Sequence, residues 1–266
     1  MKRSTLFWGT LLVLAGALLL LDNLNLLPIR MWDLFWPTML ILLGGWILIN
    51  SLTSKRTFES EHLQIPLEGA TSVRLKVNHG AGRLHLSAGA GLANLAEGDF
   101  VGGLDLRMDD EGQEMDVEMS VPSRNFPTGP WMWGRQSLDW NVKLNPEVPI
   151  RLDIRTGANE ADINLAGLQV SELRLATGAS STRLGLPESA GFTRVKVEAG
   201  AASVSVRVPS GVAARIHTEG GLASISVDKA RFEALGSGYY QSTGFDSAEN
   251  KVELDVSAGV GSVDIR

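Results

Sequence analysis

The chain has 266 residues, of which 44% are hydrophobic, with 29 glycines, no cysteine and a net charge of -6. The length suffices for one large or two modest domains, and the missing cysteine excludes disulfides, a thiolate nucleophile and cysteine-ligated metal centres. The acidic balance disfavours a nucleic-acid binder, which needs a basic stripe, and the four histidines lack the spacing of a metal site.

Charge is distributed unevenly along the chain. Residues 1–56 carry five Lys or Arg and two Asp, a net of +3, so the rest of the chain holds 19 basic and 28 acidic side chains, a net of -9. Such an asymmetry marks a boundary between two physical environments. We therefore predict two domains, residues 1–56 and residues 57–266.

The first domain has the pattern of a membrane hairpin. Residues 6–21 and 34–49 are two uncharged, mostly apolar runs of 16 residues each. Each run makes about 24 Å of helix, and flanking residues extend it toward the roughly 30 Å hydrocarbon core. The pattern predicts two transmembrane helices, over about residues 5–24 and 34–52.

A signal peptide is the alternative for the first apolar run, with Lys2 and Arg3 as its basic start. The sequence after Leu21 reads DNLNLLP and lacks the small-residue cleavage pattern, and a second apolar run follows soon after. The hairpin therefore explains the segment better.

Tryptophans and basic residues orient the predicted hairpin. Indole rings favour the headgroup region of a bilayer. Four tryptophans lie near the ends of the predicted spans: Trp8, Trp32, Trp36 and Trp46. Four basic residues flank the outer ends, against one, Arg30, in the connecting loop. By the positive-inside rule both termini, and with them the second domain, are expected in the cytoplasm, on a multi-pass membrane protein.

The second domain is a repeat. Six similar segments align on a glycine, and four of these glycines follow one another at intervals of 21 or 22 residues. The six glycines are Gly80, Gly157, Gly178, Gly200, Gly221 and Gly259. A fixed period of this size is typical of a stacked, quasi-one-dimensional array. Each unit is expected to be a strand, a bend at the glycine and a second strand.

Alternation within a repeat assigns the faces of the strands. In residues 194–208, valines alternate with charged or hydroxylic residues, and residues two apart on a strand share a face. The valines therefore point inward and the polar residues outward. The pattern predicts an all-β domain of the β-solenoid or β-helix type with a period of about 21 residues.

Stacking in register also arranges the outward residues in columns. If the coils follow one another in chain order, Arg151, Glu172, Arg194 and Arg215 line up, and so do Asp153, Arg174, Lys196 and His217. Cross-strand ion pairs of this kind contribute up to about 1 kcal/mol each, and they help to set the register. We interpret the columns as a solvated face and not as a ligand site.

Two insertions interrupt the repeat, at residues 88–137 and 228–250. The first contains two alternating runs about the turn DDEG, which predicts a β-hairpin. Both insertions carry loops with large apolar side chains: Phe126, Trp131, Met132, Trp133, Tyr239, Tyr240 and Phe245. These side chains form either a cap over an open end of the array, which solenoids require, or a partner-contact surface. Both interpretations stay open from the sequence.

The sequence contains no motif that carries chemistry. The glycine patterns match neither GxGxxG nor GxxxxGK[ST], and there is no GxSxG. The acidic run 109–111 lies in a turn and lacks the further oxygen ligands of a calcium loop. We therefore expect no catalytic residue, no cofactor, no metal and no nucleic-acid partner.

Two segments resemble known bacterial families. The stretches FWGTLLVLAGALLLLDNLNLL and LFWPTMLILLGGWIL resemble the LiaI/LiaF-type transmembrane region. The stretch VPIRLDIRTGANEADINLAGLQVSELRLATGASSTRLGL, with the closing YQSTGFDSAENKVELDVSAGVGSVDI, resembles the toastrack, putative-adhesin and LiaF C-terminal β-domains. The resemblance implies a protein of the bacterial envelope. LiaF-like members are accessory regulators that restrain a membrane histidine kinase in the response to cell-wall damage, and the family defines no catalytic residues.

The first hypothesis is thus a non-enzymatic, membrane-anchored accessory protein whose partners are the lipid bilayer and a membrane sensor kinase or other membrane protein. The alternative is a structural or adhesin-like module that binds envelope or extracellular material, which requires the second domain to lie outside the cell. An enzyme acting on envelope polymers would need clustered carboxylates in a cleft, and the sequence gives no sign of them.

Overall fold

The computed structural model describes residues 13, 36–37, 39–46, 60–111, 114–122 and 138–266. The chain divides into an N-terminal unit and a β-domain unit, and each is described by itself. In the first unit the described residues are helical, most of them in the segment 39–46. None of the helices in the described ranges is long and apolar enough to cross a membrane. The predicted spans, residues 5–24 and 34–52, lie largely outside the described residues.

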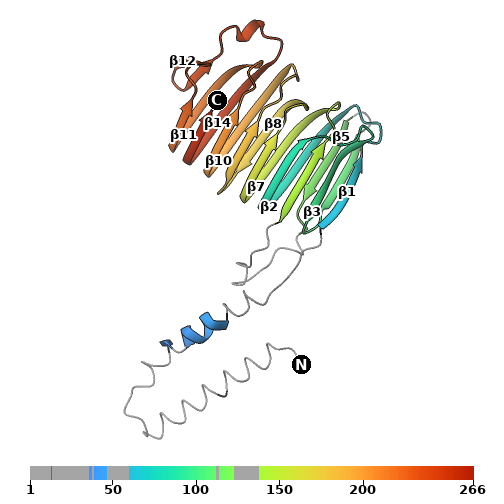
Figure 1. Cartoon of the computed structure of the whole chain (residues 1–266), viewed down its shortest axis with the longest axis vertical. Coiled ribbons are helices and arrows are strands. Elements are labelled where there is room, and N and C mark those ends of the chain that lie inside the picture. Colours follow the sequence, from blue (N-terminus) through green and yellow to red (C-terminus); the bar gives the residue numbers. More distant parts are fainter. Residues whose placement is uncertain (1–12, 14–35, 38, 47–59, 112–113, 123–137) are drawn as a thin grey trace. The chain divides into compact units, whose positions relative to one another are not determined.

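The second unit is a row of long, bent strands lying side by side (Figure 1). This confirms the prediction of an all-β domain. The strands are β1 (Ser60–Pro66), β2 (Ser72–Ala88), β3 (Asn94–Val101), β4 (Asp105–Glu111), β5 (Glu114–Ser120), β6 (Asp139–Leu144), β7 (Pro149–Asn164), β8 (Gln169–Thr177), β9 (Ser181–Gly185), β10 (Phe192–Arg207), β11 (Ala213–Val227), β12 (Glu233–Gly236), β13 (Tyr239–Gln241) and β14 (Lys251–Ile265). A short 3-10 turn, η2 (Phe245–Ser247), precedes β14.

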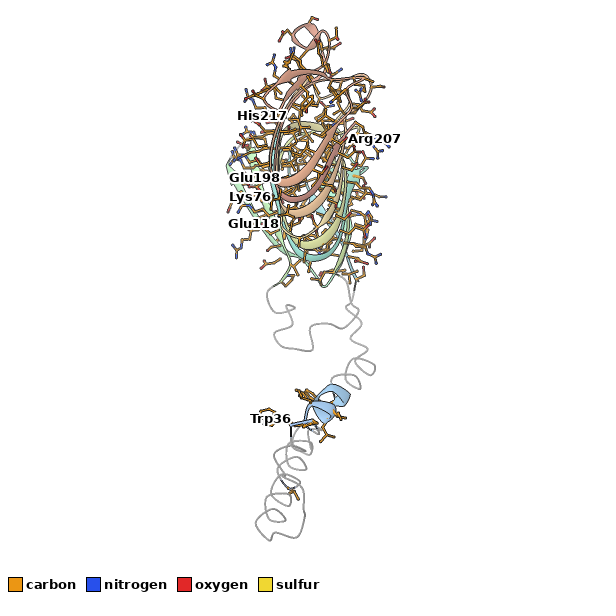
Figure 2. All side chains as sticks on the ribbon, turned by 90° about the vertical axis from the view of Figure 1, so that its left-hand side faces the viewer. Trp36, Lys76, Glu118, Glu198, Arg207 and His217 are labelled. Atoms are coloured by element: carbon orange, nitrogen blue, oxygen red, sulfur yellow. The ribbon has the colours of Figure 1, made fainter. Side chains whose placement is uncertain are left out.

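The repeats form parallel coils paired in register. Each coil consists of an N-terminal half-strand, a bend at the repeat glycine and a C-terminal half-strand. We call the sheet of N-terminal halves the first wall and the sheet of C-terminal halves the second wall. Val197 of β10, for example, lies opposite Leu175 of β8 on one side and Val256 of β14 on the other. Figure 2, which views the stack from its β11 end, shows the coils as nested arcs around one interior.

The interior is the apolar face that the alternation predicted. The inward positions of β10 are buried, with Val197 and Val206 fully inaccessible to solvent. Residues from both walls belong to one continuous core, which is the reason a single coil is insufficient: its apolar face is covered only when neighbouring coils stack on it. Each such side chain contributes roughly 1.5–3 kcal/mol of burial free energy.

The bends require glycine because neighbouring coils touch there through their backbones. A Cβ placed on Gly157 would lie 2.3 Å from the carbonyl oxygen of Gly80, and one on Gly259 would lie 2.8 Å from that of Gly200. Contacts below 3.0 Å demand a shift of backbone. The repeat glycines are therefore explained by close stacking at the corner.

The order of the last coils differs from the prediction. The sequence-based alignment placed Arg215 directly after Arg194 in the outward column, but β14 pairs with both β10 and β11 and lies between them. Glu253 of β14 thus separates the two arginines, 3.8 Å from Arg194 and 3.3 Å from Arg215. With β14 inserted, this column alternates in sign, where the chain order would bring two arginines together.

Near the other end, too, the order of the strands in the sheet differs from their order in the chain. β5 and β6 pair with the two halves of β2 and together form a coil outside it, although they follow β2 in the chain. The hairpin predicted about DDEG is confirmed as β4 and β5, which pair antiparallel. The prediction that residues 109–111 lie in the turn is wrong, because these residues belong to β4 and pair with β5.

Antiparallel strands cover both walls at one end of the stack and the first wall at the other. At one end β3 pairs with β6, and β1 with β3, in the second wall, while β4 pairs with β5 in the first wall. At the other end β13 pairs with β11, and β12 with β13, in the first wall. Insertion 228–250 therefore covers the first-wall edge of β11, which agrees with the cap, one of the two interpretations of its aromatic residues.

Candidate interaction surfaces

The outer face of the first wall carries charged side chains of both signs. Lys76, Glu118, Glu198 and His217 project from this flank, and Arg207 projects from the other (Figure 2). Acidic side chains pair with basic side chains on the neighbouring strands, as Glu253 does. Most of these side chains are well exposed, so each pair contributes little stability. The face is thus solvated and nearly balanced in sign.

Glu114 of β5 shows how such pairs bridge coils. Arg74 and Arg151 lie opposite each other on β2 and β7, a like-charge contact. Glu114 approaches both guanidinium groups, at 3.3 Å and 3.4 Å. The outermost coil therefore neutralises the repulsion between the two coils inside it.

A shallow groove follows the glycine corner. Its volume is about 830 Å³, and it is lined chiefly by glycine and alanine, with Arg155, Glu198 and Glu219 as its charged residues. The close backbone contacts at Gly157 and Gly259 already explain the small residues. The groove has no aromatic residue in its lining, and its charges do not converge on one point. It therefore lacks the convergent polar groups of a small-molecule site.

A row of serines crosses the outer face of the second wall toward β11. Ser181, Ser203, Ser262 and Ser224 are successive partners across β9, β10, β14 and β11. The hydroxyl of Ser262 donates a hydrogen bond to that of Ser203 over 3.2 Å. This row contrasts with the charged columns of the first wall.

A polar cluster is buried where β2, β6 and β7 meet. His79 is inaccessible to solvent, and its Nε2 lies 2.9 Å from the carbonyl oxygen of Leu138. Its ring is 5.1 Å from that of Trp140, and it lies opposite Thr156. Burial lowers the pKa of the His79 imidazole, against the raising effect of the bond to Leu138 and of the Asp139 charge. The side chain is therefore neutral at physiological pH.

Several polar atoms of this cluster have no protein partner. They are His79 Nδ1, Trp140 Nε1, Thr156 Oγ1, and both side-chain polar atoms of Asn159. Buried polar atoms normally carry a hydrogen bond, so this is the most costly polar region of the domain. The sequence did not indicate this buried polar cluster, because His79 follows the alternation like an ordinary repeat residue.

The aromatic residues of the second insertion occupy different environments. Tyr239 stacks on His217, with ring centroids 4.2 Å apart, and is 45% exposed. Tyr240 is half-buried against the core, and Phe245 is buried with the guanidinium of Arg215 over its ring at 4.3 Å. Tyr239 is the most exposed of the three.

His217 also contacts acidic side chains. Its Nδ1 lies 2.8 Å from Asp255, and its Nε2 lies 3.8 Å from Glu219. No nucleophile completes this arrangement, and within the described ranges no group of His, Asp and Glu is placed to hold a metal ion. We interpret these contacts of His217 as interactions that hold β13 and β14 against β11.

The remaining predicted residues cannot be placed. Trp8 and Trp32 lie outside the described residues, as do all members of the first aromatic loop: Phe126, Trp131, Met132 and Trp133. Trp36 is helical and 57% exposed, and Trp46 ends the described helical segment. The membrane-interface role of the four tryptophans stays a prediction.

Comparison with known proteins agrees with this architecture. Residues 6–48 match the LiaI-LiaF-like transmembrane region. Residues 53–207, more than half of the chain, match the N-terminal domain of toast_rack, DUF2154. No curated protein sequence gives a significant match.

Two solved structures resemble the chain. A putative cell adhesion protein from Clostridium sporogenes shares 22% identity over 78% of this chain and 98% of its own, with a TM-score of 0.72. This likeness shows a shared fold. A putative adhesin from Bacteroides fragilis covers 80% of this chain and 98% of its own, at 8% identity and a TM-score of only 0.33.

The matched transmembrane region and the β-stack together define a class: a membrane-associated protein built from non-enzymatic domain families. More particularly, the chain belongs to the toast_rack family, with a LiaI-LiaF-like transmembrane region in front of its β-domain.

Proposed function

We propose that this protein is a membrane-anchored accessory regulator of the envelope-stress type, which works through protein–protein contacts and not through catalysis. The observation that carries the proposal is the succession of two matches in one chain, a LiaI-LiaF-like transmembrane region at residues 6–48 and a toast_rack domain from residue 53. The N-terminal helices contact the lipid bilayer and the membrane helices of a sensor kinase. The β-domain presents a fixed surface to the same or a second partner.

The physical character of the domain supports this role. Its walls are continuous hydrogen-bonded sheets around one apolar core, so the outward side chains are held at defined spacings. Its outer faces are exposed and polar, and the groove at the corner is shallow and without convergent chemistry. Such a body is suited to contact another protein and is poorly suited to enclose a reacting molecule.

The sidedness of the domain follows from the charge bias. Lys2, Arg3, Lys55 and Arg56 flank the spans on the side of the termini, and we place the β-domain in the cytoplasm on this ground. A fusion of alkaline phosphatase or a fluorescent protein to Arg266 tests the placement. Fluorescence without phosphatase activity is the expected result. Phosphatase activity would instead favour the adhesin-like alternative.

The regulatory role is tested in the host bacterium with a reporter for the cell-wall stress response. Deletion of the gene should raise the uninduced reporter signal, because a restraint on the kinase is lost, and overproduction should lower it. The deletion strain is then complemented either with residues 1–56 alone or with the full chain, and the two reporter signals are compared. A reporter that responds to neither deletion nor overproduction would rule out the regulatory role.

A further inference from the structure

The second wall ends at an open edge. In the first wall, β13 and β12 continue the sheet beyond β11, but their pairing reaches only residues 215–217 of that strand. The C-terminal half of β11 pairs with β14 alone among the described strands. The first wall therefore extends beyond the second wall by two strands, each about 4.8 Å wide. We call this extension, formed by β13 and β12, the overhang, and the difference in length between the two walls the step.

The backbone of this half-strand has free hydrogen-bonding groups of known direction. Asp228 donates its N–H to the carbonyl oxygen of Ile265 in β14. Because successive residues of a strand direct these groups to opposite sides, Ser224 and Ser226 also face β14. Ala223, Ile225 and Val227 therefore direct their N–H and C=O groups away from β14, toward the empty side.

The edge has none of the usual protection against pairing. Proteins guard exposed edges with charges, proline or bulges, yet the segment from Gly220 to Val227 contains no charged residue and no proline. The corresponding edge at the other end, β1, carries Glu61 and ends in Pro66. In the second wall, therefore, the edge strand at one end is protected against pairing and the edge strand at the other end is not.

Exposed apolar side chains adjoin the same edge. Leu222 is 85% exposed, and its partner on β14, Val260, is 52% exposed. Ile225, whose side chain points into the interior, is only partly covered. A strand added here would lie beside Leu222 and Ile225 of β11.

We propose that this edge, the C-terminal half of β11, accepts one extended strand from a partner protein and so completes the second wall. The strand is uncharged and alternates apolar side chains, which pack beside Ile225, with small polar ones that continue the serine row at Ser224. Main-chain hydrogen bonds to Ala223 and Ile225 supply the affinity, as in other strand-addition interfaces. This inference concerns the β-domain alone and does not depend on the regulatory role.

The overhang favours a single strand over a second copy of the chain. Two copies paired edge to edge through β11 would each bring β12 and β13 into the space that the other copy's first wall occupies. One strand, by contrast, fits under the overhang without displacing it. A partner that supplies an extended segment is therefore the occupant that the step accommodates.

The test uses the full chain in lipid nanodiscs and a synthetic peptide. The probe is the blocked peptide AASVSV, residues 201–206, which is uncharged, has the proposed alternation and forms part of the equivalent half of β10. Amide hydrogen exchange of β11 is followed with and without peptide. At a free peptide concentration ten times Kd, exchange at Ala223, Ile225 and Val227 should slow about tenfold, while the amides of β1 stay unchanged.

Two controls make the result specific. The first is the same peptide with proline at its two valines, Val204 and Val206, which cannot donate the ladder bonds and should give no protection. The second is Ala223→Pro, which removes one free N–H and leaves the bonds to β14, so that peptide binding weakens at least tenfold while the unfolding temperature is kept.

Three outcomes would overturn the proposal. They are exchange at β11 that does not respond to the peptide up to its solubility limit, equal protection by the proline peptide, and protection of β11 before any peptide is added in a chain that sediments as a dimer. The last would assign the edge to a second copy. If Ala223→Pro fails to fold, the comparison of the two peptides on the unmodified chain still decides.

Discussion

At the scale of single residues, the corner glycines set the distance between coils. At Gly157 and Gly259 the carbonyl oxygen of the neighbouring coil's glycine leaves no space for a side chain. Their regular spacing was visible in the sequence, and so was their association with a bend. The close contact itself was not, because it depends on which coils become neighbours.

Gly157→Ala tests this explanation. The added methyl group would lie 2.3 Å from a backbone oxygen, so the coils must move apart, and we expect the free energy of unfolding to fall by about 1–3 kcal/mol. Gly211→Ala is the matched control, because nothing lies within 4 Å of its added Cβ; it should change stability by less than about 0.5 kcal/mol. Chemical denaturation of both variants gives the comparison. Equal effects would contradict the stacking explanation.

Buried His79 makes a second prediction at this scale. Its pKa is lowered in the folded protein, chiefly by burial, so the unfolded chain binds the extra proton more readily. Stability from this residue is therefore complete above the unfolded pKa of about 6.5 and falls as the pH drops below it toward the folded value.

Thermal unfolding between pH 7.5 and 5 measures the effect, with His79→Phe as the comparison. The variant should show a shallower decline in unfolding temperature over this range, whatever its absolute stability. An identical pH profile in both proteins would show that His79 is not the titrating group.

At the scale of the elements, local pattern predicted the strands and non-local pairing decided their order. The alternation around Val195 and Val197 correctly assigned the inward face, because the period of a strand is a property of the strand itself. The position of β14 between β10 and β11 could not be predicted in this way. The repeats are so alike that several stacking orders bury the same apolar face, and the alternation within one strand does not distinguish among these orders.

The sequence was less informative about surfaces. It identified Tyr239, Tyr240 and Phe245 by type, but not that Phe245 lies under Arg215 while Tyr239 remains open. The open edge of β11 was missed for a different reason. An unguarded half-strand becomes visible only when the partners of every strand are known.

Glu253→Lys tests the role of the alternating column. The substitution places a third positive charge between Arg194 and Arg215, where Glu253 now approaches both. We expect a loss of about 1 kcal/mol at low salt, reduced at high salt because the side chains are partly exposed. Glu188→Lys makes the same charge change at an exposed loop position outside the strands. A loss shared equally by both variants would show that net charge, and not the column, is responsible.

At the scale of the whole molecule, the β-domain is a stack whose two ends differ. One end is finished in both walls by antiparallel strands, and the other leaves half of β11 open. This difference gives the stack a direction, and the open half of β11 is the place at which we propose that a partner strand binds. The chain joins this stack to a membrane-associated N-terminal region.

The stacking order is the claim on which these arguments depend, and cysteine cross-linking in the cysteine-free chain tests it directly. Ser203 and Ser262 are opposed on adjacent strands, whereas Ser203 and Ser224 are separated by β14. Adjacent parallel strands hold Cα atoms about 4.8 Å apart, within disulfide range, and strands two apart hold them near 9.6 Å, beyond it. Under mild oxidation S203C/S262C should form an intramolecular disulfide and S203C/S224C should not. A disulfide in the second pair and none in the first would contradict the account.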